Sequence, residues 1–108
     1  MISKTMQDAV DEQINKELYS SYLYLSMAAY FEGVNLPGFA KWMHVQADEE
    51  REHGMKFCQH LADRGGKVQL KAIAAPQTDW KTSLEAFKQV REHEAAVTAS
   101  IYALYELA

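Results

Sequence analysis

The stretch PGFAKWMHVQADEEREHGMKF, residues 37–57, decides the fold that the sequence predicts. It opens on a proline, which suits the first turn of a helix, and contains no later proline. At the helical period, one face of residues 38–64 is apolar: Phe39, Met43, Ala47, Gly54, Phe57 and Leu61. Glu50 lies on this apolar face, and His53 lies one turn further on, toward its edge. The stretch therefore indicates an amphipathic helix that buries a carboxylate.

Two further segments of similar length are free of proline, at about residues 4–32 and 83–108. Ser3 is a suitable N-cap for the first, and the sequence TSLE at 82–85 is a capping box at the start of the other. The first two helical segments are separated by about five residues, as in an antiparallel hairpin of helices. We therefore predict an all-α fold, a bundle of three long helices, in a single domain spanning residues 1–108.

A long connection, from Gly65 to Thr82, separates the second and third predicted helices. Its 18 residues, at about 3.3 Å each, can span a helix of this length. The third helix can therefore start beside the start of the second. Three apolar residues predict that the connection is an ordered segment packed across the bundle, namely Val68, Leu70 and Ile73.

Composition excludes several classes of protein. With 108 residues the chain is too short for two domains, and no apolar run approaches the roughly 20 residues of a membrane helix. The formal net charge is −4 without a basic cluster, which argues against nucleic acid and membrane partners. The single cysteine, Cys58, excludes an internal disulfide and a Cys-x-x-Cys motif. The first residues lack the apolar core of a secretory signal, so we expect a cytoplasmic protein.

Three glutamates fall on the apolar faces of the predicted helices, one on each helix: Glu17, Glu50 and Glu94. With the first helix antiparallel to the other two, they share one height with His53 near the middle of the bundle. Ionised carboxylates in an apolar core cost many kcal/mol unless a cation or protons compensate. No lysine or arginine lies on these faces, so a metal ion is the natural counterion. Carboxylates with one imidazole suit Fe(II), Mn(II) or Zn(II), and a bridging carboxylate suits a dinuclear centre.

Several side chains near the middle of the predicted bundle have more than one interpretation. A single buried glutamate can be protonated or hydrogen-bonded instead, although this accounts poorly for three of them with a histidine. Tyr24 can hydrogen-bond a metal ligand or donate an electron, and it can equally be a packed core residue. We expect His44, His60 and His93 at the surface or the rim, and Cys58 as a buried residue without a chemical role.

Four stretches together resemble the bacterial non-haem ferritins, over the whole chain: NKELYSSYLYLSMAAYF at 15–31, PGFAKWMHVQADEEREHGMKF at 37–57, LADRGGKV at 61–68 and HEAAVTASIYALYELA at 93–108. The resemblance implies a ferritin-like bundle in which four residues bind iron at a ferroxidase centre: Glu17, Glu50, His53 and Glu94. It also implies that Glu50 bridges two irons and that Tyr24 is the tyrosine beside the centre. A bacterioferritin would carry a methionine between the Glu and His of the motif, and a rubrerythrin would carry Cys-x-x-Cys pairs. Neither feature is present.

The resemblance further implies iron storage, in which Fe(II) binds and is oxidised by O₂ or peroxide to Fe(III) for deposition as mineral. Zn(II) and Mn(II) are expected surrogate metals. Ferritin subunits have a fourth long helix and a short fifth beyond these three, so we expect a truncated domain with an open apolar side and an incomplete second iron site. We expect homo-oligomers to close that side, and a cage if the missing helix is supplied. The alternative is a truncated or engineered fragment, a structural or assembly module with a vestigial or single-metal site.

Overall fold

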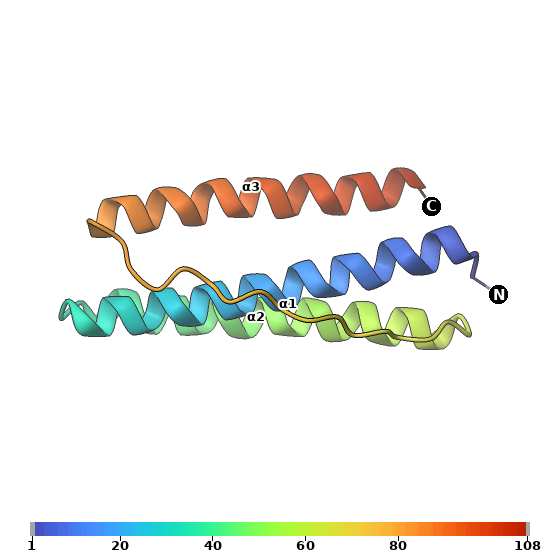
Figure 1. Ribbon diagram of the computed structural model, residues 1–108, viewed down its shortest axis with the longest axis horizontal. Helices are drawn as coiled ribbons and strands as arrows, with labels where there is room; N and C mark the ends of the chain where they lie inside the picture. Colours follow the sequence, from blue (N-terminus) through green and yellow to red (C-terminus); the bar gives the residue numbers. More distant parts are fainter. Residues whose placement is uncertain (1, 108) are drawn as a thin grey trace.

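The computed structural model describes residues 2–107 and folds them into three α-helices. These are α1 (Lys4–Gly33), α2 (Pro37–Asp63) and α3 (Ser83–Leu107), and no strand occurs in the described part of the chain. The helices lie side by side in a rod of 50 × 20 × 20 Å, with α2 and α3 running in the same direction and α1 in the opposite one (Figure 1). The predicted all-α class and the predicted helix boundaries are therefore confirmed to within one or two residues.

Local sequence explains where α1 and α2 begin and where the chain turns between them. The Ser3 hydroxyl accepts a hydrogen bond from the backbone N–H of Met6 at 3.1 Å, which caps α1 as predicted. After Gly33 the chain turns through Asn35, whose φ of 60° is tolerated best by glycine and asparagine. Pro37 then occupies the first turn of α2, where no backbone donor is needed.

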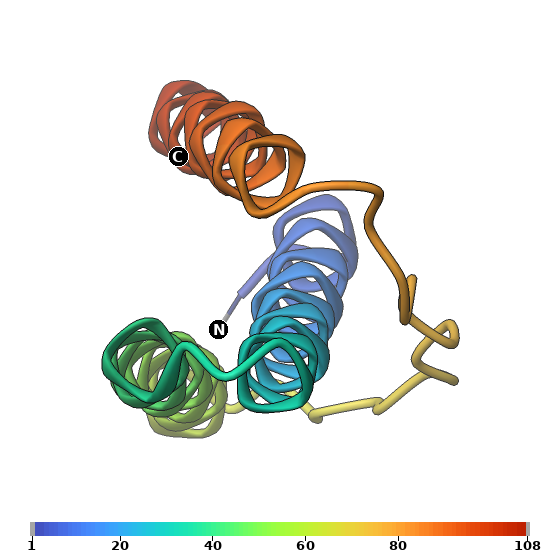
Figure 2. The same ribbon diagram turned by 90° about the vertical axis from the view of Figure 1, so that its left-hand side faces the viewer.

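Helix α1 is the centre of the fold. It packs along α2 on one side and against α3 on another, whereas the backbones of α2 and α3 do not approach each other within residues 2–107 (Figure 2). The resulting groove between α2 and α3 has a volume of about 740 Å³ and is floored by α1. Tyr105 of α3 lines this groove and is 74% exposed. Ile101 and Leu104 line the groove beside Tyr105, so α2 leaves this apolar face of α3 uncovered.

Two apolar clusters stabilise the bundle, one on either side of its middle. The larger contains residues from α1, α2, α3 and the crossover, including Met27, Phe31, Met43, Trp80 and Val90. The smaller lies toward the other end and centres on Val10, Ile14 and Leu61. Each large side chain buried in this way contributes about 1.5–3 kcal/mol. The apolar clusters leave a polar layer between them, which contains the buried residues Glu17 and Ser20 of α1.

The crossover between α2 and α3 lies along α1, and polar side chains of α1 hold its backbone. Three of these side chains are spaced four residues apart and so share one face of the helix. The contacts are Lys67 N–H to Gln7 Oε1 (3.3 Å), Gln69 N–H to Asp11 Oδ1 (3.1 Å), Asn15 Nδ2 to the Ala72 carbonyl (3.2 Å) and Ser26 Oγ to the Gln77 carbonyl (2.7 Å). The predicted ordered segment is thus present.

The contacts that keep the crossover ordered differ from the apolar contacts predicted from the sequence. Val68 packs against the smaller apolar cluster, but Leu70 is 69% exposed and Ile73 is 39% exposed. Backbone donors and acceptors of an extended segment must find partners, and here α1 supplies them. Hydrogen bonds to the backbone therefore hold the middle of the crossover, whereas Val68 and Trp80 anchor its two ends in the apolar clusters.

The hydrogen bond from Gln69 N–H to Asp11 should contribute most to stability among these contacts, because Asp11 is almost fully buried. We expect Asp11→Ala to lower the free energy of unfolding by about 1–3 kcal/mol, since it leaves the N–H of Gln69 without its acceptor. Urea denaturation measures this. The matched control is Asp8→Ala, which removes an exposed ion pair with Lys4 and should cost at most about 0.5 kcal/mol. Equal losses in the two variants would contradict the proposed role of Asp11.

Candidate metal centre

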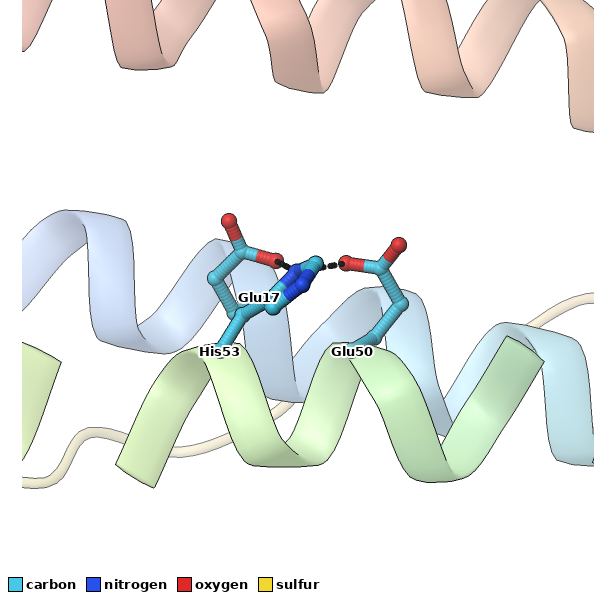
Figure 3. Close-up of side chains that lie close together, drawn as sticks. All are labelled: Glu17, Glu50 and His53. Atoms are coloured by element: carbon cyan, nitrogen blue, oxygen red, sulfur yellow. Dashed lines mark ion pairs between the residues drawn. The ribbon is translucent and has the colours of Figure 1, made fainter. Parts of the chain in front are cut away.

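Three of the predicted site residues converge in the polar layer. Glu17 of α1 and Glu50 and His53 of α2 each offer one ligand atom, and these atoms lie within 4.8 Å of one another. The Nδ1 atom of His53 is 3.5 Å from Oε2 of Glu50 and 3.8 Å from Oε2 of Glu17. The imidazole therefore lies between the two carboxylates (Figure 3).

Close packing of α1 on α2 creates this geometry. Glu50 and His53 are three residues apart and so lie one turn apart on the same face of α2. Directly after them comes Gly54, which is buried against α1. A Cβ atom at Gly54 would lie 3.3 Å from Cδ2 of Leu18 and 3.6 Å from Cβ of Glu17. Because glycine has no side chain, α1 and α2 can approach each other closely at the level of the site.

Both carboxylates are buried without full hydrogen bonding. Glu17 is 0% exposed and Glu50 is 4% exposed, and the Oε2 atom of each has no hydrogen-bond partner among residues 2–107. Burial, together with the neighbouring carboxylates of Glu17 and Glu94, raises the pKa of Glu50 to about 9. A proton therefore compensates the charge of this carboxylate at neutral pH when no cation is bound.

These residues fit a divalent cation. Two carboxylate oxygens and one imidazole nitrogen are a donor set that suits Fe(II), Mn(II) and Zn(II). A cation would occupy the unpaired Oε2 atoms and replace the proton on Glu50. His53 is the exposed member, with 47% of its side chain accessible, and it lines the groove between α2 and α3 together with Glu17. The groove gives the site a route to solvent.

Glu94 and Tyr24 lie next to the cluster and are bonded to each other. The Tyr24 hydroxyl donates a hydrogen bond to Oε1 of Glu94 at 2.6 Å. Burial raises the pKa of Tyr24, and the hydrogen bond to Glu94 and the negative charges around it raise it further, so Tyr24 remains a donor. Glu94 is half-buried and its charge acts on Glu50, but within residues 2–107 it does not belong to the three-residue cluster.

His93, which was expected at the surface or the rim, lies at the contact between α3 and α1. The residue is half-buried, its Nε2 atom lies 2.7 Å from Oγ of Ser20, and its ring meets the ring of Tyr24 edge-on at 5.8 Å. Because Ser20 donates its only proton to the Lys16 carbonyl, it accepts from Nε2–H of His93. Burial lowers the pKa of His93, and the negative charges of Glu94 and Glu17 act in the opposite direction.

The two other histidines lie outside the cluster. His44 is exposed, as expected, and His60 is half-buried along the groove. The residue that sequence reasoning missed is Gln13, a buried amide whose Nε2 atom donates to Oε1 of Glu17 at 3.1 Å. Its position four residues before Glu17, on the same helical face, was the available signal.

Comparison with known proteins extends these observations. A family model described as a ferritin-like domain matches residues 7–108. All 108 residues align with a bacterial non-heme ferritin of Bacteroides fragilis at 43% identity and with one of Staphylococcus haemolyticus at 40%, covering 68% and 65% of those proteins.

Solved structures give the same result. An open pore ferritin from Archaeoglobus fulgidus superimposes with a TM-score of 0.98 at 48% identity, over the whole of this chain and 67% of that one. A closed form engineered from the same ferritin superimposes with a TM-score of 0.97. The chain thus spans about two thirds of the length of the relatives that it matches.

The raised pKa of Glu50 predicts a pH dependence of stability in the metal-free protein. The folded state holds a proton on Glu50 between pH about 4.5 and 9, where the unfolded state has lost it. Stability from this group is therefore fully present below pH about 4.5 and declines as the pH rises to about 9. We expect Glu50→Gln to melt at a higher temperature than the parent at pH 8 and to show a flatter pH profile.

Thermal melts in the presence of a chelator, from pH 5 to pH 9, measure this difference. The matched control is Glu49→Gln, because Glu49 is the exposed neighbour on the same helix. Its profile should parallel that of the parent. Parallel profiles for Glu50→Gln as well would show that Glu50 carries no proton in the folded state.

Proposed function

The chain belongs to the ferritin family, and we propose that it serves iron storage by binding Fe(II) at the Glu17–Glu50–His53 cluster and oxidising it to Fe(III). The observation that carries the proposal is the pair of buried Oε2 atoms, which have no hydrogen-bond partner among the described residues. Carboxylates buried in this way cost free energy unless a cation or a proton neutralises them. Their retention in a bundle core is explained by a cationic substrate.

The proposed reaction is an oxidation of bound iron, which is the substrate. Two Fe(II) ions give one electron each to O₂, which also takes up two protons and becomes H₂O₂. With peroxide as the oxidant, the same two electrons and two protons yield two molecules of water. Anionic carboxylate ligands stabilise the higher charge of Fe(III) more than that of Fe(II), so they favour the oxidation. Fe(III) is then released for mineral storage.

Each residue has a proposed task in this scheme. Glu17 and His53 hold one iron, and Glu50 bridges to a second iron that Glu94 also binds. Tyr24 positions Glu94 through the 2.6 Å hydrogen bond that its hydroxyl donates. The apolar clusters on either side of the site limit water to the approach through the groove.

We further propose that the chain works as a homo-oligomer in the cytoplasm, without nucleic acid or membrane partners. No helix of the described structure combines the length and apolar character needed to cross a bilayer. The apolar groove between α2 and α3 is lined by residues such as Ile101, Leu104 and Phe57, and soluble proteins tend to cover surfaces of this kind. Self-association is the proposed cover.

One observation favours a second candidate function, a structural or assembly module with a single-metal or vestigial site. Only three ligands converge within residues 2–107, and Glu94 stands outside their cluster. Such a module would bind one ion or none and would oxidise Fe(II) no faster than buffer does. An anaerobic Fe(II) titration that counts ions per chain separates the two candidates.

A functional site should also stabilise the fold by mass action. At a free Zn(II) concentration of 100 times Kd, binding to the folded state alone adds about 2.7 kcal/mol to the free energy of unfolding. We therefore expect Zn(II) to raise the melting temperature of the parent but not that of Glu17→Gln. An unchanged melting temperature in the parent would support the vestigial site.

The sharpest test of the catalytic proposal is Glu50→Ala. If both irons need this carboxylate, the variant should oxidise Fe(II) in air no faster than buffer, as followed by Fe(III) absorbance. Glu49→Ala is the matched control and should keep the parent rate, because Glu49 is exposed. Retention of the parent rate by Glu50→Ala would rule out the bridging role.

A further inference from the structure

Gln13 is a buried polar residue whose side chain contacts Glu17 of the candidate metal centre. It lies on α1 one turn before Glu17 and is only 3% exposed. Its amide Nε2 donates a hydrogen bond of 3.1 Å to Oε1 of Glu17. Burying an amide costs free energy unless it is hydrogen-bonded, so its presence in the core calls for a role that an apolar side chain could not fill.

The hydrogen bond from Gln13 gives the two carboxylate oxygens of Glu17 different surroundings. Oε1 is bonded to Gln13, whereas Oε2 has no hydrogen-bond partner among the described residues and lies 3.8 Å from Nδ1 of His53. A carboxylate held at one oxygen cannot rotate freely, so the other oxygen keeps its direction toward Glu50 and His53. The arrangement leaves one oxygen of Glu17 available to a cation.

The chemistry of the amide suits this task. An amide donates a hydrogen bond without carrying charge, so it does not compete with a cation for the carboxylate. A lysine or arginine in its place would neutralise Glu17 and weaken metal binding. Groups that hydrogen-bond metal ligands fix ligand orientation in other metal sites, and their loss typically weakens metal binding about 10- to 100-fold.

We propose that Gln13 is a positioning residue that orients the Glu17 carboxylate for a divalent cation bound by Glu17, Glu50 and His53. The proposal rests on the metal-binding function proposed above. Gln13 touches no metal itself and acts only through Glu17. Its contribution is to restrict the carboxylate before the cation arrives, which lowers the entropic cost of binding.

The test is an anaerobic titration of the chain with Co(II), whose visible spectrum reports the number and geometry of its ligands. Gln13→Met keeps the length and volume of the side chain but removes the donor. We expect its Kd for Co(II) to rise about 10- to 100-fold and its Co(II) spectrum to change. Gln13→Leu is a second apolar variant that gives the same readout if the methionine variant folds poorly.

The chain contains a matched control in Gln59. Its Nε2 atom donates to Oδ1 of Asp63 at 2.7 Å, also four residues apart on one helix, but this pair is exposed and away from the site. Gln59→Met should therefore leave the Kd and the spectrum at parent values. An equal loss in both variants would overturn the proposal, since it would reflect general helix destabilisation.

A double-mutant cycle separates positioning from plain packing. In a Glu17→Gln background, Gln13→Met should cause little further loss of Co(II) affinity, because the carboxylate on which it acts is gone. A full additional loss in that background would overturn the proposal. If the parent binds Co(II) and Gln13→Met binds equally well, only the role of Gln13 fails. If the parent binds no Co(II), the proposed function fails and this inference fails with it.

Discussion

The constraint on which the rest of the structure depends is the burial of two carboxylates between α1 and α2. Glu17 and Glu50 lie in the core, and one carboxylate oxygen of each has no hydrogen-bond partner among residues 2–107. Their apolar environment disfavours an ionised group. The fold compensates with apolar clusters on both sides of the polar layer. Gly54 contributes as well, because it lets the helices meet at the site without a side chain between them. The stability of the bundle therefore comes from its two ends, and the candidate metal centre lies in the middle.

Helical periodicity predicted much of this arrangement. It placed Glu17 and Glu50 on inward faces and His53 toward the edge of one, and their common height followed from the antiparallel order of α1 and α2. Those inferences were reliable because a helix fixes both direction and rise for every residue. The cluster of three residues was thus accessible from the sequence, although its metal binding stays a prediction.

The features that the sequence did not reveal depend on pairs of side chains from separate elements. Periodicity assigns His93 to a face of α3, but it does not say that Ser20 of α1 offers an acceptor there. It also marks Leu70 and Ile73 as apolar without showing that the crossover is held through its backbone. Where a face is half-covered, as along the groove beside α3, an apolar pattern does not distinguish a buried residue from an exposed one.

The way α1 holds the crossover has a consequence for sequence variation. Its polar side chains bind peptide groups of residues 67–77, and every residue type except proline supplies both of those groups. Proline is unfavourable at positions 67 and 69, where the N–H is the donor. The outward side chains of the crossover are otherwise free to diverge. This segment can acquire new surface properties over evolution, or accept an engineered epitope, while the cluster of Glu17, Glu50 and His53 inside the bundle is left unchanged.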